Sequence, residues 1–107
     1  MADIKKSSGN IFEDMGFASP RDELLKANLT ARISAILQAR KIKQADAAIL
    51  LDIDQPKVSA LKNGKYTGFS VERLLDLLLS LEQDIDIIIK PRENINRPAE
   101  IHVFAAY

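Results

Sequence analysis

Apolar residues recur at helical spacing between residues 19 and 40. Ser19 is a good N-cap, Pro20 suits the first helical position, and the basic pair Arg40 and Lys41 suits the C-terminal end. One side of this segment would carry a continuous apolar stripe, which predicts a helix that packs against a core. The stripe consists of Leu25, Leu29, Ile33, Ile36 and Leu37.

Two shorter helical segments follow, separated by a tight turn. The first covers residues 44–51 and the second residues 55–63, with Asp52 to Asp54 as the turn between them. Asp54 can cap the second segment, and Gly64 is a natural stop after it.

A leucine-rich fourth helix begins after Ser70, which can cap it. Leucine falls on nearly all sides of this segment, which predicts burial from more than one direction, by the domain core and by a partner. Its leucines are Leu74, Leu75, Leu77, Leu78, Leu79 and Leu81.

The hydrophobic period then changes from helical to alternating. The alternation predicts two strands, at residues 84–90 (DIDIIIK) and 100–104 (EIHVF). A two-stranded hairpin alone is marginal in water, so it must lie on the helices or pair with the equivalent strand of a second subunit. The chain thus divides into an arm (1–18), a helical domain (19–83) and a C-terminal β element for dimerisation (84–107), with no role evident for residues 93–107.

Length and composition limit the protein to one small core. The 107 residues are 47% apolar and 28% charged, which is ordinary for a globular protein. No apolar stretch is long enough to span a bilayer or resembles a signal peptide, so we expect a cytoplasmic protein. Without cysteine, and with His102 as the only histidine, we expect no metal, no cofactor and no enzymatic activity.

The formal net charge is zero, but the charge is unevenly distributed. Residues 40–65 contain six basic and three acidic side chains, a local charge of +3, whereas residues 66–83 carry −2. A local basic block is enough to meet phosphates because their field is screened within about 10 Å. Charge alone leaves open whether this block binds nucleic acid or is a solvated face.

The segment QADAAILLDIDQPKVSALKNG, residues 44–64, resembles the helix-turn-helix of phage-repressor-like, Xre-type regulators without a gap. Small Ala48 would allow close helix contact, and glutamine begins both helices, at Gln44 and Gln55. Two positions depart from the pattern, because Asp52 stands where glycine is usual and Lys43 where a hydroxyl residue commonly caps. The resemblance implies a mainly α fold, a phage-repressor-like bundle of four or more helices, here with a C-terminal β-strand or hairpin.

We expect double-stranded DNA to be contacted through the second helix of this motif. Gln55 could make a bidentate contact with adenine, and Gln44 could donate to a phosphate. Lys41 and Lys43 are weaker candidates, because exposed lysines are common. The remaining candidates are Lys57, Ser59, Lys62 and Asn63 on the helix, and Lys65 and Thr67 in the following loop.

A wider resemblance covers most of residues 7–92. The stretches SSGNIFEDMGF, GFSVERLLDLLLSL and DIDIIIKPR look like a subgroup of Xre-type antitoxins found beside RelE/HigB-like ribonuclease toxins. This implies a homodimeric autorepressor that binds a palindromic operator and a toxin. A stand-alone transcription factor without a toxin, or a protein-interaction module in which the motif is only scaffold, are the alternatives.

Overall fold

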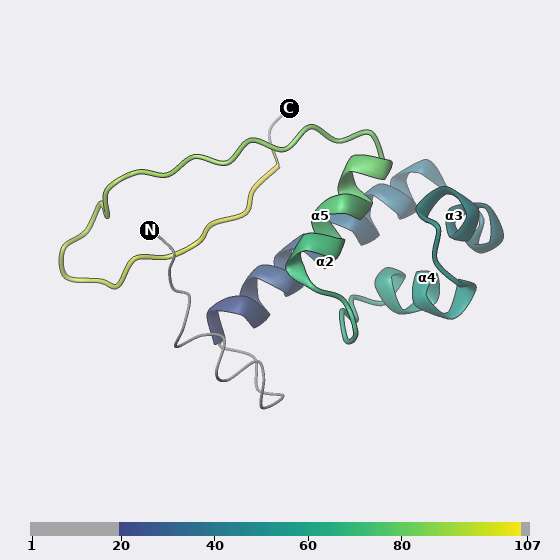
Figure 1. Cartoon of the computed structure of the whole chain (residues 1–107), viewed down its shortest axis with the longest axis horizontal. Coiled ribbons are helices and arrows are strands. Elements are labelled where there is room, and N and C mark those ends of the chain that lie inside the picture. Colours follow the sequence, from purple (N-terminus) through teal and green to yellow (C-terminus); the bar gives the residue numbers. More distant parts are fainter. Residues whose placement is uncertain (1–19, 106–107) are drawn as a thin grey trace.

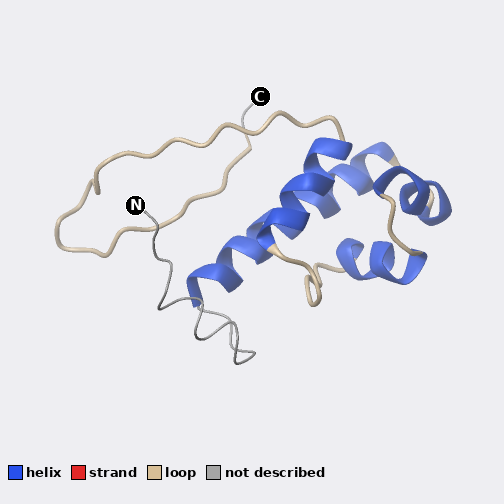
Figure 2. Cartoon of the chain, viewed as in Figure 1, coloured by secondary structure: helices blue, strands red, loops and turns tan. Residues whose placement is uncertain are grey.

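The computed structural model describes residues 20–105, and four helices account for the ordered bundle (Figures 1 and 2). The predicted arm, residues 1–18, and the predicted cap Ser19 lie outside the described residues. No helix within residues 20–105 combines the length and apolar character needed to cross a membrane. The helices are α2 (Pro20–Arg40), α3 (Gln44–Leu51), α4 (Gln55–Lys62) and α5 (Val71–Ser80).

Helix α2 is the scaffold on which the others pack. Helices α4 and α5 both pack against it, and α3 contacts both α4 and α5 (Figure 1). The predicted apolar stripe of α2 is confirmed, with Leu29, Ile33, Ile36 and Leu37 buried and Leu25 packed against the core. The other buried apolar side chains are Ala47, Leu51, Val58, Leu61, Phe69, Leu74, Leu77, Leu78 and Leu81.

The predicted starts of α4 and α5 are confirmed by their capping geometry, and α4 ends at Lys62, one residue before the predicted end. Asp54 accepts a hydrogen bond from the Lys57 amide at 3.0 Å, and Ser70 accepts one from the Arg73 amide at 3.0 Å. Asp52 takes the left-handed conformation (φ 56°, ψ 47°) that usually favours glycine, as its place in the motif required. Lys43 provides no side-chain cap for α3, so the departure from the usual hydroxyl leaves this helix start uncapped.

Helix α5 is amphipathic within the described chain, where the domain core buries it from one direction. Its inward side buries Leu74, Leu77 and Leu78, but Leu79 is 54% exposed. Glu72 and Asp76 share the exposed side with it. The core half of the prediction is confirmed, and covering of the other side by a partner stays a prediction.

The predicted C-terminal hairpin is wrong for the single chain. Residues 81–105 contain no strand; they leave α5 as an extended limb, bend, and return along a separate path (Figures 1 and 2). Beyond Gln83, the described residues form one backbone hydrogen bond, from the Arg97 amide to the Asn94 carbonyl. Beyond Gln83, one apolar residue from each limb, Ile85 and Val103, packs against the core, and the backbones of the limbs do not pair with each other.

Candidate nucleic-acid interface

Helix α4 buries one side and presents the other to solvent. Val58 and Leu61 are fully buried, which fixes the rotation of the helix about its axis. At 100° per residue, Ser59 and Asn63 then lie on the outward side, with Gln55 and Lys57 on its two flanks. Gln55, Lys57 and Asn63 are exposed and Ser59 is half-buried, so the four positions line the surface that would enter a groove.

The first residues of α3 and α4 meet through their side chains. The Gln44 amide Nε2 donates to Gln55 Oε1 at a distance of 3.5 Å, and both residues are exposed. This contact is long and weak, but it biases the orientation of the Gln55 amide. The Nε2 group of Gln55 and a second lone pair on its Oε1 remain available for a base edge. The structure therefore brings together Gln44 and Gln55, the two glutamines that are predicted from the sequence to contact DNA.

The C-terminal end of α4 is fixed to the scaffold by two side chains. Ser34 on α2 donates its hydroxyl to the Lys62 carbonyl at 2.9 Å. The Lys62 ammonium donates to the Ile42 carbonyl, 3.2 Å away in the loop between α2 and α3. Lys62 is half-buried, so its charge is already engaged in holding the motif together. Its predicted phosphate contact would compete with this hydrogen bond.

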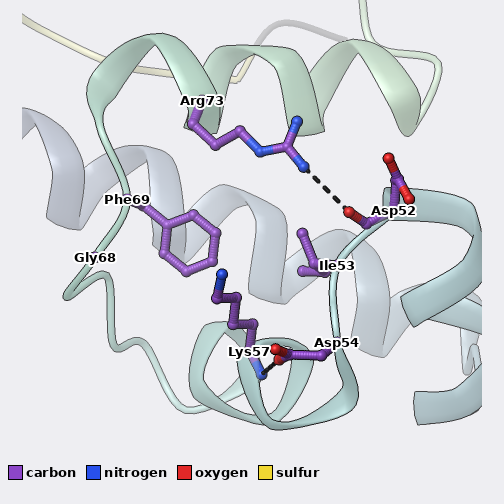
Figure 3. A pocket seen from close by; sticks show the side chains of 7 residues that line it. All are labelled: Asp52, Ile53, Asp54, Lys57, Gly68, Phe69 and Arg73. Carbon is purple, nitrogen blue, oxygen red and sulfur yellow. Dashed lines mark hydrogen bonds between the residues drawn. The ribbon is translucent and has the colours of Figure 1, made fainter.

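The turn before α4 is held from the opposite side by α5. The Arg73 guanidinium donates to the Asp52 carbonyl at 3.3 Å (Figure 3). It also donates to the Leu51 carbonyl at 3.5 Å. A hollow of about 430 Å³ lies between this turn and the loop before α5. Its two carboxylates (Asp52, Asp54) and two cations (Lys57, Arg73) balance, so it has no charge preference for a phosphate.

The loop after α4 places further polar groups beside the recognition surface. Lys65 and Thr67 are exposed, as a contact with a DNA backbone would require. Between them, the Tyr66 hydroxyl donates to Glu23 of α2 at 3.2 Å. Partial desolvation, followed by this hydrogen bond and the charge of Glu23, raises the pKa of the Tyr66 phenol, which keeps it protonated. The loop is thus tied to α2 next to its two exposed candidates.

The Asn63 side chain forms a hydrogen bond within its own end of the helix. Asn63 Nδ2 donates to the Ser59 carbonyl at 3.0 Å, which stabilises the last turn of α4. Lys41 and Lys43 are exposed at the junction of α2 and α3. Lys41 takes a left-handed conformation (φ 55°) that ends α2.

Two further residues on the outward side of α4 are apolar, so the criterion of a polar side chain does not predict them as DNA contacts. Pro56 is exposed and Ala60 is half-buried, and helical spacing places both opposite Val58 and Leu61. Small apolar groups at such positions can contact the methyl group of thymine. The signal that could have selected them is their spacing of four residues along the face shared with Ser59 and Asn63.

Comparison with known proteins agrees with this geometry. A family model described as a helix-turn-helix domain matches residues 11–90. A solved structure described as "Putative XRE Family Transcriptional Regulator" is similar to this chain, with 43% sequence identity and a TM-score of 0.75. The match covers 80% of this chain and 97% of that one. No curated protein matches the sequence.

Proposed function

Since the chain belongs to the helix-turn-helix domain family, it is a DNA-binding transcriptional regulator, and we propose that it works as a homodimeric repressor on a palindromic operator. The observation that carries the proposal is the polar end of α4, where Gln44 and Gln55 meet on an exposed surface. Twofold symmetry would place two copies of α4 about one DNA turn apart, in successive major grooves.

The proposed role of each residue follows from the chemistry of its side chain. Gln55 reads a base edge, and Gln44 contacts phosphate at the start of α3. Lys57, on the flank of α4, and Lys65 with Thr67 in the loop bind the DNA backbone and set the register. Ser59 and Asn63 complete the outward side of α4. With these roles, the protein is a cytoplasmic DNA-binding protein and not an enzyme.

Binding to the DNA upstream of the gene tests this proposal. The affinity should fall with salt concentration, with a slope that reflects the number of phosphates neutralised. It should be much higher for the upstream palindrome than for a scrambled sequence of equal length. Equal, weak binding to both DNAs would favour an interaction module in which the motif is scaffold.

We further propose that the protein is an antitoxin of a RelE/HigB-like toxin and represses its own operon. The support is the resemblance of its motif and flanking stretches to that antitoxin subgroup. Co-purification with the product of the neighbouring gene separates this from a stand-alone transcription factor.

The predicted arm, residues 1–18, is the candidate toxin-binding segment, because it contains four large apolar side chains in a stretch too short to fold alone. These are Ile11, Phe12, Met15 and Phe17. The alternative hypothesis is that the arm docks on its own domain instead of binding a toxin. Deleting residues 1–18 should abolish toxin neutralisation and spare operator binding. Full neutralisation by the truncated protein would refute a role of the arm, and unfolding of the truncated protein would make the arm part of the core.

A further inference from the structure

The segment after α5 exposes a row of isoleucines that nothing in the described chain covers. Ile87 is 76% exposed, Ile88 78% and Ile89 92%. The backbone of residues 84–90 forms no hydrogen bond with any other described residue. An extended segment with free amides, free carbonyls and β-branched side chains is suited to pairing with another strand.

We propose that residues 84–90 pair antiparallel with the same residues of a second copy, about a twofold axis through Ile87. This inference rests on the proposed homodimer and specifies its interface. The ends of the segment set its length. Glu82 has a left-handed backbone (φ 64°) and cannot continue a strand, and Pro91 lacks the amide needed at the other end.

The side chains alternate between two chemically different faces. Ile85, Ile87 and Ile89 share one face, and Ile85 already packs against the helical core. Asp84 and Lys90 lie at opposite ends of the other face. Residues that lie directly opposite in a ladder point to the same side, so each face of one copy meets the same face of the other.

The register centred on Ile87 is the one in which every residue from 84 to 90 pairs with another residue of that range. With Ile87 opposite Ile87 of the second copy, Ile85 lies opposite Ile89, and Asp84 lies opposite Lys90, on both sides of the axis. Asp84 of each copy then faces Lys90 of the other, which stabilises a cross-strand pair, while Asp86 lies opposite Ile88 on the same face. The most exposed isoleucine, Ile89, comes to lie beside Ile85 of the other copy, against that copy's core.

The neighbouring registers are less favourable for identifiable reasons. A shift that centres the ladder on residue 86 places Asp86 opposite Asp86, and like charges directly opposite repel. A shift that centres it on Ile88 pairs Asp86 with Lys90 but shortens the ladder to residues 86–90, because Pro91, opposite Ile85, has no amide to donate. Lys90 is held in the single chain by Glu93, at 2.7 Å, but this pair is exposed and can be exchanged on association.

Single cysteines test the register directly, because the chain contains none. Residues directly opposite have Cβ atoms about 4.5–5.5 Å apart, and diagonal neighbours about 7–8 Å, beyond the reach of a disulfide. In oxidised glutathione, Ile87→Cys should become mostly a covalent dimer. Ile88→Cys is the matched control, with nearly the same exposure in the single chain, and should stay mostly uncrosslinked.

Charge exchange gives a second, independent test. Lys90→Glu and Asp84→Lys should each lose the dimer, because each places like charges opposite one another. Mixing the two variants should restore dimers, since both cross-strand pairs are then of opposite charge. Mixing Asp86→Lys with Lys90→Glu should not restore dimers. It would restore them if the ladder were centred on Ile88, because residues 86 and 90 would then lie opposite one another.

Sedimentation of the wild-type chain distinguishes failure of this inference from failure of the proposed homodimer. A wild-type dimer whose Ile87→Cys variant does not cross-link would overturn the strand interface and leave the homodimer in place. Cross-linking through Ile88→Cys instead would overturn the register. A monomeric wild-type chain that still binds its operator would overturn the homodimer itself.

Discussion

Replacing Gln55 by alanine should weaken binding to the cognate operator and leave non-specific binding almost unchanged. Gln55 is exposed and begins α4, so its removal should not disturb the core. What is lost is a side chain whose amide is already oriented by Gln44. The variant thus separates base reading from folding.

The magnitude follows from the hydrogen bonds that Gln55 can still make. With one lone pair occupied by Gln44, Gln55 can donate one bond to an adenine and accept another from it. Two such bonds contribute about 1–3 kcal/mol, and 1.4 kcal/mol is a factor of ten. We expect the affinity for the operator to fall about 5- to 150-fold.

The assay is a titration of the operator and of a scrambled duplex at one fixed salt concentration, repeated over a range of salt. Lys65→Ala is the matched control, because it removes a proposed backbone contact away from Gln55 and should weaken binding to both DNAs alike. Lys57→Ala should reduce the slope of log affinity against log salt by about one, whereas Gln55→Ala should not change it. Equal losses on the two duplexes for Gln55→Ala would show that this residue does not read sequence.

Four further substitutions test the fold and the surfaces. Asp54→Ala should lower the free energy of unfolding by about 1 kcal/mol through loss of the α4 cap, and Asp54→Asn should not; equal melting temperatures would contradict this. Leu74→Ala should cost about 2–5 kcal/mol in denaturant unfolding, because Leu74 is fully buried. Lys62→Ala should cost about 0.5–1.5 kcal/mol of stability and change the salt slope of DNA binding little; a slope change as large as that of Lys57→Ala would assign Lys62 to phosphate. Ile89→Asp should leave stability within about 0.5 kcal/mol and abolish the dimer seen by sedimentation; a retained dimer would exclude the segment from the interface.

The helices could be predicted because their signals are local. Asp54 and Ser70 cap the helices that follow them, and the spacing of Ile33 and Leu37 selects the buried side of α2. The left-handed backbone of Asp52 could be predicted from its place in the motif. These features depend on residues a few positions apart, where sequence patterns are most informative.

The remaining features depend on contacts between distant residues. The engagement of Lys62 with Ile42, and of Arg73 with the Asp52 carbonyl, joins segments about twenty residues apart and follows from no periodicity. The C-terminal hairpin was wrong because alternation shows that residues 84–90 can form a strand and says nothing of where a pairing edge exists. Leucine content alone could not show which side of α5 faces the core; Leu79 lies on the exposed side with Glu72 and Asp76.

Side chains from α2 and α5 hold the two ends of α4, and this has a thermodynamic consequence. Ser34 holds the Lys62 carbonyl, and Arg73 holds the turn at Asp52. A recognition helix that is already ordered has little conformational entropy left to lose when it enters DNA. Calorimetry of operator binding should therefore give a small negative heat capacity change, set by the contact surface alone, without the larger contribution that accompanies folding on binding.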